Sequence, residues 1–479
     1  MSFRWGSAVR RRLVFAAPLA AAAVALLAPG TAAAVRGIDI GFAEPRLNSA
    51  DASVRERWLD RAEAAAGQWV RVGVGWRGIA SSPPADPTVS SSAGYIWAGP
   101  DAAIRDAAAR GQKILITVNR APDWAEGAGR PAGAEPGTWK PNPSDLRRFA
   151  QALGARYSGD FDDPLNPGQK LPEVSAFEAW NESNLAAFLS PQTEAGNNTS
   201  PNHYRLMLNQ FYDGIHTVQP DAQVVAGSLS PIGSDGGPPG KARIGPLEFL
   251  RDMFCLGKKN LKPRSCAVKA KFDVLSHHPI NADREPQAPA GKDDAGIAEM
   301  SEIVTMLRKA ESVGNVVGPS RHPVWNTEFW WHSNPPKTGK KIPSLREQAA
   351  YVSEALYRNW QDKVELAMLY QLGDDESLFF QTGIYFENGK PKPSLTGFSF
   401  PLVGDRRSKK KVLIWGRAPE SGKVAIQVNK AGKGGFKTIK KKMVGAGDVF
   451  KTVTKLKGKG KLRAKIGTQK SLTWKQGKK

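Results

Sequence analysis

Two glutamates stand where predicted β-strands end, and paired carboxyl groups can cleave one kind of bond. Glu182 lies in FEAWNESNL, residues 177–185, where an apolar run becomes polar. Glu328 lies in VWNTEFWW, residues 324–331. If the two faced each other, one carboxyl could protonate a leaving oxygen while the other attacked carbon or activated water, which is the chemistry of glycosidic cleavage. Structural salt bridges at the strand ends are the competing interpretation.

The elements that must position these residues alternate between β-rich runs and amphipathic helical patterns. Strands are predicted at 36–42, 68–74, 113–118, 174–180, 223–227, 272–276, 323–328 and 364–371. Helices are predicted near 51–67, 101–110, 143–157, 203–218, 246–254, 296–312 and 344–360, the third with Ser144 or Asp145 as its cap. Eight such repeats predict an α/β fold, a (β/α)8 TIM barrel. A doubly wound open sheet is the alternative, although its nucleotide-binding form would need a Gly-rich loop that is missing after strand one.

In such a barrel the active site lies at the carboxyl ends of the strands, where Glu182 and Glu328 stand. Glu178 lies within the fourth strand, and a buried, hydrogen-bonded role is expected for it. Asp374 and Asp375 follow the eighth strand and are expected in a surface loop.

The motif WNE at 180–182, with a glutamate at the end of the seventh strand, resembles glycoside hydrolase clan A. Family 39, the β-xylosidase and α-L-iduronidase group, and the cellulase-like family 5 are the most similar, over roughly residues 36–400. The resemblance implies that Glu182 is the general acid/base and Glu328 the nucleophile of a retaining double displacement. It also implies carboxyl groups ~5–5.5 Å apart.

Three further positions match the clan. Asn181 matches the residue that contacts the sugar 2-hydroxyl, and Arg71 matches one whose guanidinium keeps the nucleophile ionised. An ordinary core salt bridge is the alternative for Arg71. His278 is similar to the strand-six histidine, but Ile280 stands where a tyrosine is common, so another group must restrain the nucleophile.

Aromatic residues in the predicted strand-end loops could form platforms for the apolar faces of sugar rings. The candidates are Trp76, Trp124, Trp330 and Trp331, and ordinary core packing is the alternative for each of them. Weaker candidates for substrate contact are Asn119, Tyr370 and Gln371.

The N-terminus reads as a secretory signal peptide, cut after Ala34. Arg4 and the arginines at 10–12 precede an apolar run over 13–28 and an A-x-A site, and that run is short for the alternative, a membrane anchor. In an exported chain, Cys255 and Cys266 are expected to form a disulfide. Two cysteines without a histidine pair disfavour a metal site.

Positive charge is concentrated at the C-terminus. Residues 406–479 contain 24 Lys and Arg against two acidic residues, a net charge of +22, whereas residues 1–405 carry +1. Short alternating runs separated by glycines predict a small antiparallel β-sandwich there. Its expected partner is an anionic polysaccharide or cell-wall polyanion. Nucleic acid is not the expected partner, because the chain is expected to be exported and residues 406–479 contain few aromatics for base stacking. An ordinary solvated surface is the other alternative, but solubility requires far less charge.

The expected organisation is a signal peptide (1–34), a catalytic (β/α)8 domain (35–405) and a basic β-sandwich domain (406–479). The expected function is that of a secreted or cell-envelope glycosidase acting on a polysaccharide or oligosaccharide, from a bacterium by its composition. The alternative is a non-catalytic polysaccharide- or wall-binding protein, which would need only the cleft and the basic domain. No cofactor is expected, since neither GxxxxGK[ST] nor a strand-linked GxGxxG is present.

Overall fold

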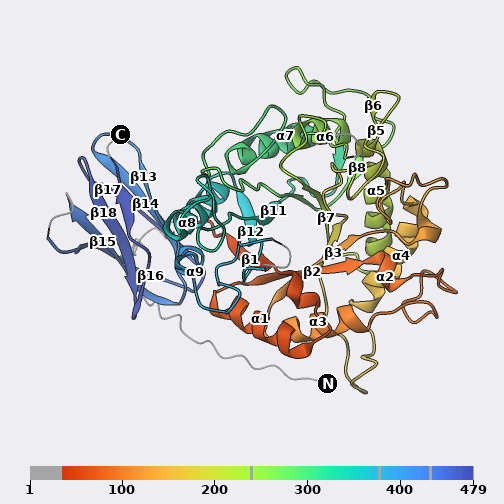
Figure 1. The fold of residues 1–479 in the computed structure, drawn as a ribbon, viewed down its shortest axis with the longest axis horizontal. Helices are drawn as coiled ribbons and strands as arrows, with labels where there is room; N and C mark the ends of the chain where they lie inside the picture. Colours follow the sequence, from red (N-terminus) through yellow and green to blue (C-terminus); the bar gives the residue numbers. More distant parts are fainter. Residues whose placement is uncertain (1–34, 238–240, 376–378, 431–433, 478–479) are drawn as a thin grey trace, which may run out of the picture. The chain divides into compact units, whose positions relative to one another are not determined.

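Eight parallel strands close into a barrel, in the order β1-β12-β11-β9-β7-β4-β3-β2 (Figure 1). This computed structural model describes residues 35–237, 241–375, 379–430 and 434–477, so the predicted signal peptide lies outside the described residues. The closed barrel confirms the predicted fold and rules out the open sheet. Its strands are β1 (Asp39–Ala43), β2 (Trp69–Gly75), β3 (Lys113–Asn119), β4 (Ala176–Ala179), β7 (Gln223–Leu229), β9 (Val274–His277), β11 (Val324–Phe329) and β12 (Val364–Leu369).

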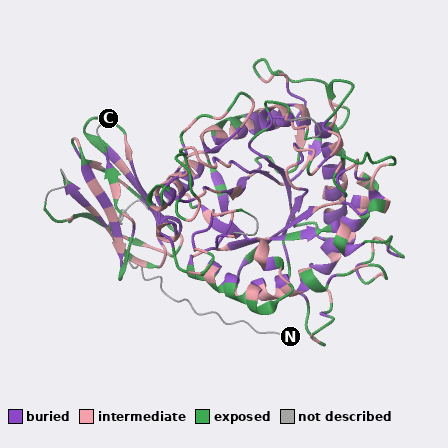
Figure 2. Cartoon of the chain, in the orientation of Figure 1, coloured by how far each residue is buried: buried purple, intermediate pink, exposed green. Residues whose placement is uncertain are grey.

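Helices surround the barrel and bury one face each against it (Figures 1 and 2). They are α1 (Ala52–Ala64), α3 (Ala98–Ala108), α4 (Pro143–Arg156), α5 (Ser200–Val218), α6 (Pro246–Met253), α7 (Met300–Ser312) and α8 (Leu345–Gln361). The cap of α4 is Asn142, whose side chain accepts from the backbone of Ser144 and Asp145, so the expectation that one of those two residues caps the helix is wrong. Shorter elements are η1 (Pro45–Asn48), α2 (Trp76–Ile79), η2 (Asp123–Ala125), β5 (Thr193–Glu194), β6 (Asn197–Asn198), β8 (Ala270–Lys271), η3 (Ile297–Glu299), β10 (Val316–Val317) and α9 (Pro393–Ser399).

The barrel interior changes from apolar to polar along the strands. An apolar layer consists of Trp69, Leu115, Ala176, Val225, Val274, Trp325, Leu366 and Met368. Side chains two residues apart on a strand point to the same face. Two residues further along five of these strands, the layer is polar and consists of Arg71, Thr117, Glu178, Ser276 and Thr327. The strand period therefore places this polar layer directly under the mouth of the barrel.

The C-terminal region forms two antiparallel sheets around one apolar core, as predicted. One sheet has the order β13-β14-β17, and the other has the order β16-β15-β18-β19, with β20 also paired to β18. The strands are β13 (Leu402–Arg406), β14 (Lys411–Arg417), β15 (Gly422–Lys430), β16 (Lys437–Val444), β17 (Val449–Lys455), β18 (Gly460–Ile466), β19 (Gln469–Lys470) and β20 (Trp474–Gln476).

The first of these sheets packs on the barrel. The ring of Trp415 in β14 lies 5.5 Å from that of Tyr357 and 6.0 Å from that of Trp360, both in α8. Arg417 is buried and donates to the carbonyl of Ile38 at 3.2 Å and to Gln68 Oε1 at 2.7 Å, at the amino ends of β1 and β2. The sandwich therefore contacts the side and bottom of the barrel, away from the mouth.

Two other predictions concern the covalent and membrane state of the chain. Cys255 and Cys266 form a disulfide, as expected. Within the described residues, no helix combines the length and the apolar character that crossing a membrane requires.

Candidate active site

Glu182 reaches the barrel mouth through a left-handed turn after β4. The strand ends at Ala179, and Trp180 and Glu182 have φ of 75° and 42°. Such a conformation costs a residue other than glycine about 1–3 kcal/mol and persists only where the surroundings impose it. Here the Trp180 indole N–H donates to the Phe188 carbonyl at 2.8 Å, and the Glu182 backbone N–H donates to the Ser228 carbonyl at 2.9 Å.

Glu328 faces the barrel interior because β11 is irregular at its end. The pairing of β11 with β12 shifts register between Asn326 and Phe329. In a regular strand Thr327 and Glu328 would point to opposite faces, but a bulge re-aims one of them, and here both side chains make interior contacts. The Asn326 side-chain oxygen accepts the Glu328 backbone N–H at 3.2 Å.

The two carboxyl groups converge on one histidine. His278 is fully buried, and its Nδ1 lies 3.1 Å from Glu182 Oε1 and 3.9 Å from Glu328 Oε2. The sum of the two distances limits the separation of Glu182 Oε1 and Glu328 Oε2 to at most about 7 Å, which is compatible with the ~5–5.5 Å between the carboxyl groups of retaining enzymes. Within the described structure His278 Nε2 has no hydrogen-bond partner. The tautomer with its hydrogen on Nδ1 is therefore favoured, because that N–H has the Glu182 oxygen as its acceptor.

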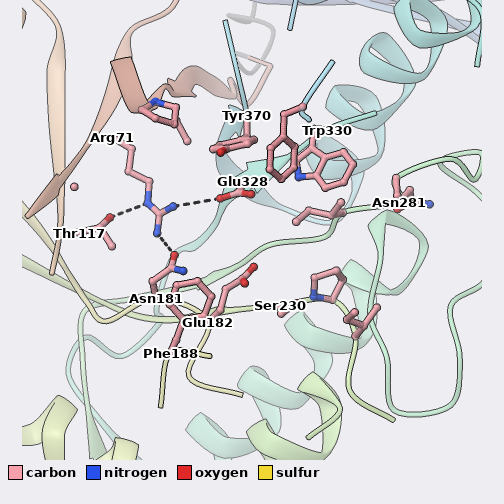
Figure 3. Close-up of a pocket in the computed structure, with 18 of the residues that line it drawn as sticks. Arg71, Thr117, Asn181, Glu182, Phe188, Ser230, Asn281, Glu328, Trp330 and Tyr370 are labelled. Atoms are coloured by element: carbon pink, nitrogen blue, oxygen red, sulfur yellow. Dashed lines mark hydrogen bonds and ion pairs between the residues drawn. The ribbon is translucent and has the colours of Figure 1, made fainter. Parts of the chain in front are cut away.

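Arg71 ties the nucleophile candidate to the polar layer (Figure 3). Its Nε donates to Thr117 Oγ1 at 2.7 Å and to Glu178 Oε2 at 2.8 Å. Its Nη2 donates to Asn181 Oδ1 at 2.8 Å, and its Nη1 lies 3.4 Å from Glu328 Oε2. Because Arg71 engages the oxygen of the Asn181 amide, the NH2 of that amide is turned away from the arginine.

Glu178 anchors this network as a buried anion, in agreement with the role expected for it. It is fully buried, and its oxygens accept from the hydroxyls of Thr117, Ser276 and Thr327 at 2.7–3.0 Å. Burial by itself would raise the pKa of Glu178, but the charges of Arg71 and His278 and the hydrogen bonds from Ser228 and Thr117 together outweigh it, and the pKa is lowered. Glu178 therefore stays ionised and holds the Arg71 guanidinium in place.

Burial raises the pKa of Glu328, and the neighbouring Glu182 carboxyl raises it further. His278 and Arg71 act in the opposite direction. Arg71 Nη1, 3.4 Å from Glu328 Oε2, is the fixed cation that favours the ionised form of Glu328.

A cavity of about 780 Å³ opens above the pair, within the range of small-molecule sites. The predicted site residues that line it are Arg71, Asn119, Asn181, Glu182, Glu328 and Tyr370 (Figure 3). His278 lies behind the wall and contacts the glutamates. Tyr370 lies near Glu328, and its pKa is raised by burial and by the Glu328 charge. Ile280 also lines the cavity, and Arg71, His278, Trp330 and Tyr370 all interact with Glu328 there.

Two of the predicted aromatic contacts are wrong. Trp76 and Trp331 are both fully buried and do not line the cavity. Trp76 stacks on Phe149 at 5.2 Å, between the barrel and its helices, and the Trp331 indole N–H donates to the Arg284 carbonyl at 2.7 Å. Trp330 does line the cavity, because successive side chains of an extended chain point in opposite directions.

The structure also places Trp124 and Asp374. Trp124 is partly buried, donates to the Ala80 carbonyl at 2.8 Å and is not among the cavity residues. Asp374 was expected on the surface, but it is buried and accepts from Lys392 Nζ at 2.6 Å. This buried ion pair holds the segment after β12 against α9.

Several cavity residues carry no recognisable sequence signal, because they come from long loops. Phe188 follows the turn after β4, Asp283 and Arg284 follow β9, and Phe380 follows β12. Each loop lacks a periodic pattern, so only its folded path reveals which side chains face inward. Within the described residues, no cluster of three or more His, Cys, Asp or Glu could hold a metal ion.

Comparison with known proteins gives a likeness in fold. No protein-family model and no curated protein matches the chain. A family 39 glycoside hydrolase from the gut symbiont Bacteroides cellulosilyticus WH2 has a TM-score of 0.53 and 17% identity, over 88% of this chain and 79% of its own. GH5_18 from Streptomyces cattleya in complex with GlcNAc has a TM-score of 0.48 and 13% identity, over 76% and 79%. A GH30 endoxylanase from Clostridium papyrosolvens C71 has a TM-score of 0.46 and 11% identity, over 88% and 97%. The chain thus shares the (β/α)8 barrel fold of the family 39 enzyme, the fold that the resemblance implied.

Proposed function

We propose that this protein is a retaining glycoside hydrolase that cleaves O-glycosidic bonds of a polysaccharide or oligosaccharide. The observation that carries the proposal is the pair Glu182 and Glu328, which share one cavity and one histidine, in an arrangement compatible with the separation that a double displacement requires. The barrel fold shared with the family 39 enzyme agrees with it.

In the first step the Glu328 carboxylate attacks the anomeric carbon, and the bond from that carbon to the leaving oxygen breaks. Glu182 gives its proton to the leaving oxygen, so the departing sugar or alcohol leaves neutral. The sugar is then an ester of Glu328. Arg71, 3.4 Å from Glu328, favours the ionised form that attack requires.

In the second step Glu182, now ionised, removes a proton from water as the water attacks the same carbon. The ester bond breaks, Glu328 is released as a carboxylate, and Glu182 regains its proton. Two inversions give net retention of configuration. His278 Nδ1 lies 3.1 Å from Glu182 Oε1, and this contact would keep the carboxyl aimed at the cavity while its proton is lost and regained.

The side chains that line the cavity are the proposed contacts to the substrate. The Asn181 NH2, free of Arg71, is placed to donate to the sugar 2-hydroxyl, a contact that strengthens in the transition state. Trp330, Tyr370 and Phe188 offer aromatic faces to the apolar side of a sugar ring. Asn119 adds a polar contact at the end of β3.

Export of the enzyme remains part of the proposal. It rests on the predicted signal peptide, 1–34, and agrees with the disulfide between Cys255 and Cys266, since disulfides persist in oxidising compartments. Polymeric substrates outside the cell would then be within reach of the enzyme.

The test is hydrolysis of a panel of aryl glycosides and polysaccharides by the protein that begins at residue 35. Activity on at least one member should fall by orders of magnitude in Glu182→Ala and in Glu328→Ala. Azide should restore turnover of an activated aryl glycoside by Glu328→Ala, with a glycosyl azide of inverted configuration as product. If no member is cleaved while wild type and both variants bind polysaccharide equally well, the non-catalytic binding protein is the correct interpretation.

A further inference from the structure

The C-terminal sandwich has one outer face covered and one open. Trp415 of the β13-β14-β17 sheet packs on α8, and Lys451 Nζ lies 5.4 Å from the Trp360 ring centre. This sheet therefore turns its outer side toward the barrel. The two sheets share one core, so the outer side of the β16-β15-β18-β19 sheet points away from the barrel.

Strand register lines up cations on that open side. Residues directly opposite each other in antiparallel strands share a face, about 4.5–5.5 Å apart. One row across the sheet runs Lys441, Ala425, Lys465, Lys470. We call the basic face the Lys and Arg side chains that this register turns outward and that are exposed or half-buried: Lys423, Lys441, Lys461, Arg463, Lys465, Lys470 and Lys475.

This basic face places like charges opposite each other in the strand register. Lys465 lies opposite Lys470, and Lys461 lies opposite Lys475, and such pairs destabilise a sheet. Within the described part of the sandwich, none of the seven cations forms an ion pair. The two acidic residues of 406–479, Glu420 and Asp448, cannot balance 24 basic ones. A surface that sustains this repulsion fits a polyanionic partner, which would remove it.

We propose that the basic face binds an acidic polysaccharide and tethers the enzyme to it, at a distance from the catalytic cavity. Lysines are compact, hydrated charges that suit diffuse contact with many anionic groups, and only one of the seven cations is an arginine. Single-stranded nucleic acid would need open aromatic rings for its bases, but Arg463 covers the Phe436 ring at 3.9 Å, and Trp474 packs against the sandwich core. The choice of a polysaccharide rests on the proposed glycosidase function.

The test is equilibrium binding of polygalacturonate to the Glu328→Ala protein, so that no polymer is cut. Binding should weaken at least about tenfold between 50 and 200 mM salt, and neutral dextran should not bind. Lys441→Gln/Lys465→Gln/Lys470→Gln removes one row and should lower the slope of log affinity against log salt by about one for each lysine that contacts the polymer. Lys340→Gln/Lys363→Gln/Lys390→Gln, an equal loss of charge from exposed barrel lysines, should leave the slope unchanged.

Three results would overturn the proposal: polygalacturonate fails to bind, the row variant binds as tightly as its parent, or the barrel variant loses as much affinity as the row variant. Tighter binding of single-stranded oligothymidylate than of polygalacturonate would instead identify nucleic acid as the partner. The assay needs no turnover. Failure of the glycosidase proposal would appear in the substrate panel and leave these binding results readable.

Discussion

Removal of the Arg71 charge should move the acidic limb of the pH–activity profile. Arg71 Nη1 lies 3.4 Å from Glu328 Oε2, and at an effective dielectric constant of about 20 two unit charges at that distance interact by about 5 kcal/mol. Glu178, 2.6 Å from Arg71, is an anion whose own charge offsets part of the effect of Arg71 on Glu328. We expect the loss of the Arg71 charge to raise the pKa of Glu328 and to move the acidic limb upward by about 1–2 pH units.

The variant must not leave a buried charge behind. Arg71→Met alone would strand the Glu178 anion and cost about 3–5 kcal/mol of stability. We therefore choose Arg71→Met/Glu178→Gln, which removes both charges and keeps the volumes similar. Glu178→Gln alone is the matched control, because it keeps the Arg71 cation beside Glu328 and removes only the Glu178 anion that opposes it.

The assay is kcat/KM against pH on the best aryl glycoside from the panel. Glu328 must be ionised to attack, so activity is lost as the pH falls through its pKa, and a raised pKa moves this acidic limb to higher pH. The double variant should show that shift, whereas Glu178→Gln should show no shift or a small one to lower pH. A double variant that unfolds like wild type and whose acidic limb moves by less than about 0.3 units, or downward, would refute the assigned role of Arg71.

Three other predictions concern substrate binding and the stability of the fold. Trp330→Ala should raise KM about tenfold, because it removes an aromatic platform from the cavity. Trp331→Ala should instead lower the free energy of unfolding by about 3–5 kcal/mol, because it empties a buried site. Equal KM values for the two variants would contradict this assignment. Lys392→Met should lower the free energy of unfolding in urea by about 3–5 kcal/mol, because it leaves the Asp374 carboxylate buried without its cation. Adding Asp374→Asn should recover most of this loss, and a double variant no more stable than Lys392→Met would contradict the buried ion pair. Reduction of the disulfide should lower the free energy of unfolding by about 2–3 kcal/mol, and an unchanged urea midpoint would show that it contributes nothing.

Much of the barrel could be predicted from the sequence, because burial imposes a period on strands and helices. The runs that contain β2 and β3 are apolar enough to be recognised without tertiary information. Glu182 and Glu328 were found because each stands where such a run ends. Glu178 was recognised as a structural residue because its position inside β4 requires a buried partner, which is Arg71.

The failures share a physical cause: the direction of a loop side chain depends on what packs against it. Trp330 and Trp331 are chemically identical neighbours, yet one lines the cavity and the other fills the core. Asp374 is polar and follows a strand, but Lys392, 18 residues later, neutralises it in the interior. Phe188 faces the cavity through the turn after Glu182, and no local pattern encodes that turn.

The most direct test of the central claim is the identity of the covalently labelled residue. The protein would be incubated with the 2-deoxy-2-fluoro analogue, carrying an activated leaving group, of whichever glycoside it cleaves, and then digested for peptide mass spectrometry. The proposed mechanism predicts one sugar on the peptide that contains Glu328 and none in Glu328→Gln. A label on Glu182 or Glu178, or turnover with inverted product and no covalent adduct, would contradict it.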